Sequence, residues 1–155
     1  MNILIHPFSR PTLNGQTNAK NYAYWNELVE LLKPEHQITQ IATQEEPKIV
    51  DDIKRGLSFD DLKILASKYD FFIAVDSFFP HFVNAYNLPI KGMVIWTISD
   101  PDIFGYKDKF LNVLQSRNNL RKEQFNMIEE EVYDPNKSIK PEIVKDLIDK
   151  YFIAR

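Results

Sequence analysis

The sequence lacks cysteine altogether, and only four of its 155 residues are glycine. The absence of cysteine excludes disulfides and thiolate metal sites. The few glycines form neither a Gly-x-Gly-x-x-Gly nor a Walker-type phosphate loop, and there is no Gly-x-Ser-x-Gly nucleophile elbow. The three histidines, His6, His36 and His81, do not have zinc-binding spacing, and His36 has no supporting context. We therefore predict no metal and no cofactor.

The sequence also lacks a strong net charge and long apolar runs. The formal net charge is −3 with both signs mixed along the chain, which argues against nucleic acid as a partner. No run approaches the length of a membrane span, and residues 1–7 lack the features of a signal peptide, so we expect a cytoplasmic protein. Hydrophobic residues make up 44% of the chain, which is typical of one globular domain, here residues 1–155.

Short apolar runs alternate with amphipathic segments along the chain. Strands are predicted at residues 2–6, 37–42, 48–53, 71–75 and 92–97. Helices are predicted at residues 19–33, from Ser58, at 80–86 and from Lys140. Residues 109–133 are hard to interpret, and 115–136 are left unassigned. Because the strands are apolar on both faces, we predict an α/β fold with a single Rossmann-like, doubly wound parallel sheet and helices on both faces.

The end of the predicted strand 71–75 is the best candidate for a binding site. The apolar run stops there at Asp76-Ser77, and a short helical pattern carrying His81 follows. At such a junction, backbone N–H groups and the helix dipole favour an anion. The alternatives are that Asp76 or Ser77 merely caps the helix and that His81 is satisfied by the backbone.

Other polar residues are expected at the same edge of the sheet. Lys20, near the start of the first long helix, would meet a phosphate there or would simply be solvated. Glu45 and Glu46 follow a strand, where a carboxylate can bind a ribose diol or serve only solubility. His6 and Asp100 are second-tier candidates, because a packing role for the first and turn formation for the second are the stronger interpretations.

Together these pieces resemble the C-terminal, donor-binding half of the lipopolysaccharide heptosyltransferases, glycosyltransferase family 9. The specific part is Val75-Asp76-Ser77-x-x-x-His81, followed by an apolar strand and the turn Thr97-x-x-Asp100-Pro101. The resemblance implies one half of a two-domain GT-B enzyme. The chain departs from the family pattern at Phe78, where the family usually has glycine, and the half that binds the acceptor and supplies the catalytic base is absent.

By this resemblance, the position of Lys20 would contact the donor's phosphates and Glu45 or Glu46 its ribose. Asp76 and Ser77 would meet the sugar and the diphosphate, with His81 close behind. No catalytic residue is assigned.

We therefore expect a glycosyltransferase-like protein that binds a nucleotide-sugar and completes its cleft as a homodimer or with a partner protein. An aromatic surface near Phe78 and Phe79 would make that contact. The alternatives are a non-catalytic nucleotide-binding or protein-interaction module that retains the fold, and a hydrolase that uses water as the acceptor.

Overall fold

The computed structural model describes residues 1–121 and 131–154, and within them one sheet of parallel strands. The sheet has the order β3-β2-β1-β4-β5-β6. The strands are β1 (Asn2–His6), β2 (Gln37–Ala42), β3 (Ile53–Arg55), β4 (Phe71–Val75), β5 (Lys91–Trp96) and β6 (Leu111–Leu114). The edge strands are short, with three residues in β3 and four in β6. The predicted Rossmann-like parallel sheet is confirmed.

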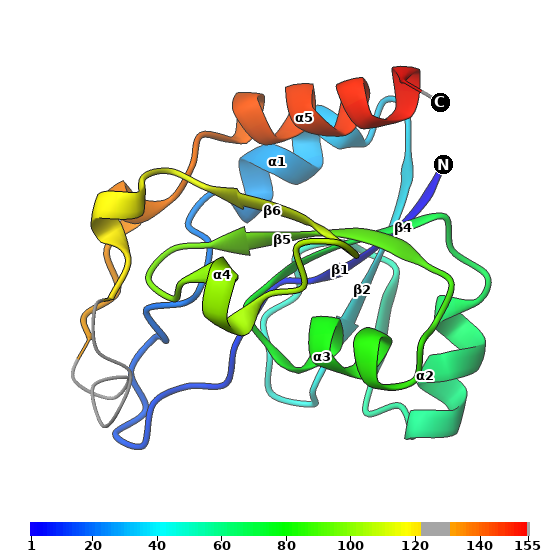
Figure 1. The fold of residues 1–155 in the computed structure, drawn as a ribbon. Coiled ribbons are helices and arrows are strands. Elements are labelled where there is room, and N and C mark those ends of the chain that lie inside the picture. The colour runs from blue at the N-terminus through cyan, green and yellow to red at the C-terminus, as the bar shows by residue number, and fades with distance from the viewer. Residues whose placement is uncertain (122–130, 155) are drawn as a thin grey trace.

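Helices cover both faces of the sheet (Figure 1). One face carries α1 (Trp25–Leu32) and α5 (Pro141–Ile153), whose buried Leu28 and Ile148 belong to a core cluster with Ile3 and Phe71. The other face carries α2 (Phe59–Ala66) and α3 (Phe78–Ala85). Their cluster contains Leu62, Phe79, Val83, Leu4 and Phe72. The short α4 (Pro101–Phe104) precedes β6, and single 3-10 turns lie at Arg117–Asn119 and Pro135–Lys137.

Three predicted strands agree with the structure residue for residue: β1, β2 and β4. The predicted helix 19–33 begins only at Trp25. Residues before it form turns, because the Asn18 side chain accepts a hydrogen bond from the Lys20 amide at 2.9 Å and its carbonyl accepts from the Asn21 amide at 3.0 Å. Such local side-chain bonds compete with helix formation.

The predicted strand 48–53 is wrong, because β3 contains only Ile53–Arg55. The fully buried Gln40 explains the difference. Its side-chain amide donates to the Pro47 carbonyl at 2.8 Å and accepts from the Ile49 amide at 2.7 Å. These bonds hold the connection as a loop. β6 lies in the stretch 109–133 that gave no prediction, and residues 122–130 of the unassigned segment fall outside the described residues.

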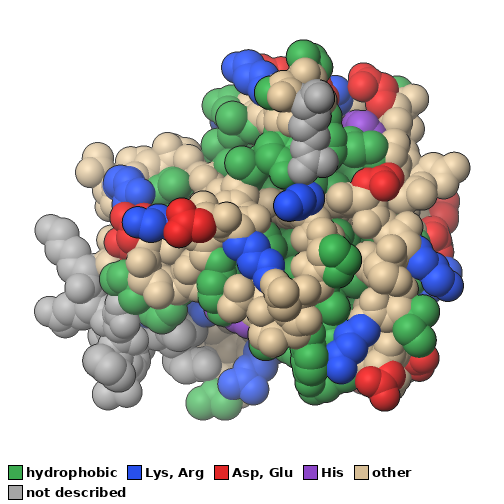
Figure 2. All heavy atoms as spheres, turned by 45° about the vertical axis from the view of Figure 1, so that its right-hand side comes forward, with side chains coloured by type: hydrophobic (Ala, Val, Ile, Leu, Met, Phe, Trp, Pro, Cys, Tyr) green, Lys and Arg blue, Asp and Glu red, His purple; other side chains and the backbone are tan. Residues whose placement is uncertain are grey.

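Charged side chains of both signs are interspersed over the face shown in Figure 2, with apolar groups between them and no basic stripe. Among residues 1–121 and 131–154, no helix combines the length and the apolar character that crossing a bilayer requires.

Candidate functional site

A crevice opens at the carboxyl ends of the central strands. The chain runs outward from β1 through β2 to β3 and then returns to β4 on the other side of β1, so the strand order reverses between β1 and β4. Ligands of open parallel sheets bind at this reversal. A cavity of about 490 Å³ lies here, lined by residues of the loop after β1, by Thr43 and Glu46 after β2, and by the β4–α3 junction.

Asp76 lies at the wall of this cavity, and its side chain is 7% exposed. Its Oδ2 is 3.0 Å from the Lys20 ammonium, and its Oδ1 is 3.5 Å from His81 Nε2. Burial by itself would raise the pKa of the Asp76 carboxyl. Contact with His81 and the charge of Lys20 outweigh that effect and hold the pKa below its ordinary value. The structure thus brings Lys20, predicted from a distant part of the sequence, to Asp76 and His81.

Ser77 occupies the N-cap position of α3, but its side chain does not cap the helix. Instead Ser77 Oγ lies 2.8 Å from His6 Nδ1 and donates to the Val75 carbonyl at 3.2 Å. Burial lowers the pKa of His6 to about 4, so this ring is neutral at physiological pH. Both residues line the cavity. The second-tier candidate His6 therefore lies within the crevice, and simple helix capping by the Ser77 hydroxyl is wrong.

The two glutamates after β2 lie at different depths. Glu46 lines the main cavity, and its Oε2 accepts a hydrogen bond from the Thr43 amide at 3.1 Å. Burial raises the pKa of Glu46, although the Thr43 bond opposes the shift. Glu45 lines an adjoining cavity of about 270 Å³, which shares Arg10, Asn18 and Glu46 with the first. The crevice is therefore divided into two connected parts.

Asp100 does not line either cavity. Its side chain caps α4 by accepting from the Asp102 amide at 2.9 Å, and it lies 3.8 Å from the Arg117 guanidinium. The structural role that the sequence favoured, at a turn before a proline, matches this geometry. The structure does not bring Asp100 to the crevice.

The predicted aromatic surface near Phe78 and Phe79 needs a correction. Phe79 is fully buried, because its ring packs edge-on against Phe72 of β4 with centroids 5.2 Å apart. Phe78 is 46% exposed, lines the cavity and stacks on the exposed Phe59 of α2 at 5.5 Å. The exposed aromatic residues on α2 and α3 are therefore Phe59, Phe78 and, at the far end of α3, Tyr86, while Phe104 of α4 is also exposed.

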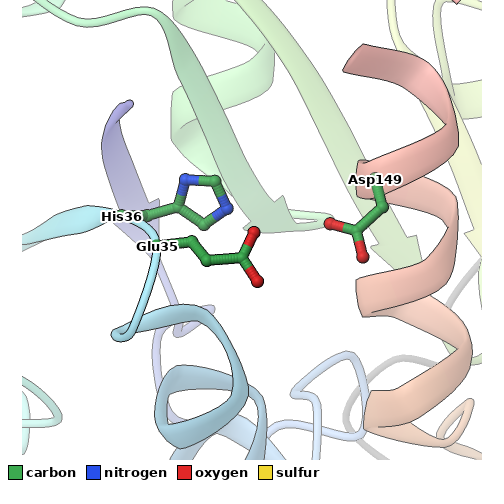
Figure 3. Close-up of side chains that lie close together, drawn as sticks. All are labelled: Glu35, His36 and Asp149. Carbon is green, nitrogen blue, oxygen red and sulfur yellow. The ribbon is translucent and has the colours of Figure 1, made fainter. Parts of the chain in front are cut away.

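A second group of titratable side chains lies at the amino end of the sheet (Figure 3). His36 precedes β2, and its ring points toward the carboxylates of Glu35 and Asp149, with one potential ligand atom from each residue within 4.8 Å of the others. The ammonium of Lys145 is already there, 2.7 Å from an Asp149 oxygen and 3.4 Å from Glu35. A lysine thus supplies the positive charge that the carboxylates need.

The loop after β1 contributes residues that the sequence did not single out. Ser9 Oγ donates to the Asp76 carbonyl at 2.6 Å, and the Ser9 amide donates to Asn21 Oδ1 at 2.8 Å. Asn18 Nδ2 donates to the Arg10 carbonyl at 3.0 Å. These bonds fix the loop over the cavity. No motif marks them, because each is a single polar residue whose partner is distant in sequence or lies in irregular backbone.

The fold can be compared with solved structures. E. coli ADP-heptose lps heptosyltransferase II superposes with a TM-score of 0.66 at 14% identity, covering 99% of this chain and 46% of that chain. E. coli heptosyltransferase WaaC with ADP gives a TM-score of 0.60 at 15% identity, covering 96% and 43%. The chain has the fold of less than half of a heptosyltransferase. WaaC with ADP-2-deoxy-2-fluoro heptose gives the same TM-score at 14% identity.

Neither a protein-family model nor a curated protein sequence matches the chain. At this level of identity, the likeness to the heptosyltransferases shows the fold, and fold alone does not fix function. The chain spans 43% to 46% of the length of the two heptosyltransferase chains.

Proposed function

We propose that the crevice binds a nucleotide-sugar and that the chain is the donor-binding part of a glycosyltransferase-like protein. The observation that carries the proposal is Asp76, a buried carboxylate held between Lys20 and His81 at the wall of a large cavity. Polar groups of this kind converge on ligand sites at strand reversals. Two of the similar structures are heptosyltransferase WaaC with ADP and with ADP-2-deoxy-2-fluoro heptose, which supports this class of ligand.

The crevice offers distinct groups to distinct parts of such a ligand. Ser77 stands at the N-terminus of the eight-residue α3, where unpaired amides and the helix dipole attract a diphosphate. Glu46 and Glu45 line the two connected parts of the crevice, where a carboxylate accepts hydrogen bonds from a ribose diol. His81 and Asp76 then lie toward the sugar. We assign these residues to binding and none to catalysis.

Transfer of the sugar requires an acceptor held in line and water excluded. We propose that a second copy or another protein completes the cleft, with the half-exposed Phe78 at the cavity as the contact. Size-exclusion chromatography with light scattering tests self-association. Phe78→Ser is the appropriate variant, because Phe79 is buried in the core. A monomer that nevertheless transfers sugar would contradict this part of the proposal.

Isothermal titration against ADP-, GDP- and UDP-sugars tests the ligand class. We expect one series to bind and Ser77→Ala to weaken it. Ser67→Ala is the matched control, because Ser67 Oγ lies at the end of α2 and donates to the Ile64 carbonyl. If none of the nucleotide-sugars gives heat at millimolar concentration, the proposal is wrong.

A second candidate, a module that retains the fold without catalysis, is favoured by Phe78. Its half-exposed ring lines the cavity at the position where the heptosyltransferase family usually has glycine. A bulky ring there narrows the approach of a phosphate to the α3 amides. Under this alternative the protein binds a nucleotide, but no sugar is released or transferred in the presence of any partner. Thin-layer analysis of a radiolabelled nucleotide-sugar distinguishes the two.

A further inference from the structure

The lysine that lines the crevice, Lys20, already forms an ion pair. The Lys20 ammonium lies 3.0 Å from Asp76 Oδ2, and the Asp76 side chain is 7% exposed. Separating this pair would leave a carboxylate buried without its countercharge, which is strongly unfavourable. Lys20 therefore cannot turn to a phosphate without a large cost. A second cation at the crevice would strengthen the binding of a ligand that carries two or more negative charges.

Arg10 lines both connected parts of the crevice. Its backbone is held by the Asn18 side chain, which donates to the Arg10 carbonyl at 3.0 Å, and by the following Pro11. The residue is exposed, and its guanidinium has no hydrogen bond or ion pair with any residue in 1–121 or 131–154.

The other described arginines all have partners. Arg55 donates to the backbone carbonyls of Thr43 and Glu46, at 2.7 and 2.8 Å. Arg117 lies 3.2 Å from Asp102, and Arg121 lies 3.3 Å from Glu131. Among these four, Arg10 is thus the one whose guanidinium has neither a hydrogen bond nor an ion pair with the described residues, although Nε and Nη2 of Arg121 also lack a hydrogen-bond partner. A guanidinium binds phosphate oxygens in a bidentate manner that an ammonium does not reproduce.

We propose that Arg10 is the cation that binds the diphosphate of the ligand, and that Lys20 is a positioning residue that holds Asp76. The assignment of this anion to a nucleotide rests on the proposed function. The Arg10 site also narrows the ligand class: the crevice should prefer nucleoside diphosphates and their sugars to nucleosides and monophosphates. The Arg10 side chain then joins the two cavities, with the diphosphate between base and sugar.

Isothermal titration of wild type and Arg10→Gln with ADP, GDP, UDP and inorganic pyrophosphate tests the proposal. We expect the variant to lose about tenfold to a hundredfold in affinity for the diphosphates, the range of a charge-assisted hydrogen bond. Its affinity for the corresponding nucleoside and its melting temperature should not change. Arg10→Lys should recover part of the loss. Arg117→Gln is the control, because that side chain pairs outside the crevice.

Pyrophosphate separates this inference from the proposed function. If wild type binds pyrophosphate through Arg10 but no nucleotide, the proposed function fails and the Arg10 site stands. If Arg10→Gln binds pyrophosphate as wild type does, or if wild type does not bind it at all, the inference is overturned. It is equally overturned if Lys20→Met loses diphosphate binding selectively with an unchanged melting temperature.

Discussion

The two ends of the sheet carry similar sets of side chains in different surroundings. At the carboxyl end Asp76 meets Lys20 and His81, and at the amino end Asp149 and Glu35 meet Lys145 and His36. The carboxyl-end carboxylate is 7% exposed beside a cavity of about 490 Å³, whereas the amino-end carboxylates are 35% and 62% exposed. Charge composition alone therefore does not distinguish a candidate site from a solvated ion pair. Burial and the reversal of strand order do.

The largest expected effect comes from removing each carboxylate in turn. Asp76→Ala leaves Lys20 without its countercharge next to the core, and we expect the free energy of unfolding to fall by about 3–5 kcal/mol. Asp149→Ala removes a partly exposed i,i+4 pair and should lower it by less than about 1 kcal/mol. Urea unfolding followed by tryptophan fluorescence measures both. Equal losses at the two ends would remove the distinction between them.

The pH dependence of stability provides a second contrast. Burial lowers the pKa of His6 to about 4 from 6.5, so below pH 6.5 the unfolded chain binds a proton that the folded chain does not. This part of the stability is complete above pH 6.5 and falls as the pH drops toward 4, by about 3 kcal/mol in total. The free energy of unfolding of His6→Gln should depend less on pH between 4 and 6.5 than that of wild type. His36→Gln is the control, because burial also lowers the pKa of His36 but its ring is less buried than that of His6. If His36→Gln reduced the pH dependence of stability as much as His6→Gln does, the attribution to His6 would be contradicted.

A third, smaller effect is expected at the crevice wall. Phe78→Gly removes the ring contacts with Phe59 and Phe82 and introduces a flexible residue in α3, lowering the free energy of unfolding by about 1–2 kcal/mol. We expect the affinity for the best nucleotide to rise by about threefold to tenfold as the α3 amides become accessible. Tyr86→Gly, at the other end of α3, is the control for titration. Unchanged affinity in Phe78→Gly would mean that the ring does not restrict the site.

The smallest effect is expected from Lys145→Met. The variant should lower the free energy of unfolding by less than about 1 kcal/mol, because the Asp149 and Glu35 carboxylates regain water. Nucleotide affinity measured by titration should equal that of wild type, since the crevice lies at the opposite end of the strands. A change in affinity would show that the two ends are coupled.

Local patterns predicted the part of the fold that depends on continuous apolar runs. The bounds of β1 and β4 follow from such runs ended by polar or turn-forming residues, whereas β2 mixes polar and apolar residues. β6 was missed because it is short and Val113 is its one buried residue. The prediction of a strand at residues 48–53 is wrong for residues 48–52 because the side chain of Gln40 holds this connection as a loop, and a buried glutamine leaves no periodic pattern in the sequence.

The candidate site divides in the same way. Asp76, Ser77 and His81 could be predicted because a strand-to-helix junction places them in one stretch. Lys20 was predicted from its place near the start of the first long helix and again from the resemblance. The partner of each could not be predicted. The His6–Ser77 contact spans 71 positions, and Arg10 has no sequence pattern that separates it from any surface arginine. Their proximity depends on how the loop after β1 folds back over the sheet. The single domain over residues 1–155, the cytoplasmic location and the homodimer remain predictions.

The short edge strands limit how the chain can associate. β3 and β6 offer three and four residues, too few to provide a long row of free backbone groups for another strand. Extending the sheet from one molecule into the next would therefore gain few hydrogen bonds. A protein that completes the cleft, as proposed above, would instead have to recognise side chains near the crevice mouth. The short edge strands thereby disfavour polymerisation through strand pairing, and they do so without covering the crevice at the carboxyl ends of the central strands.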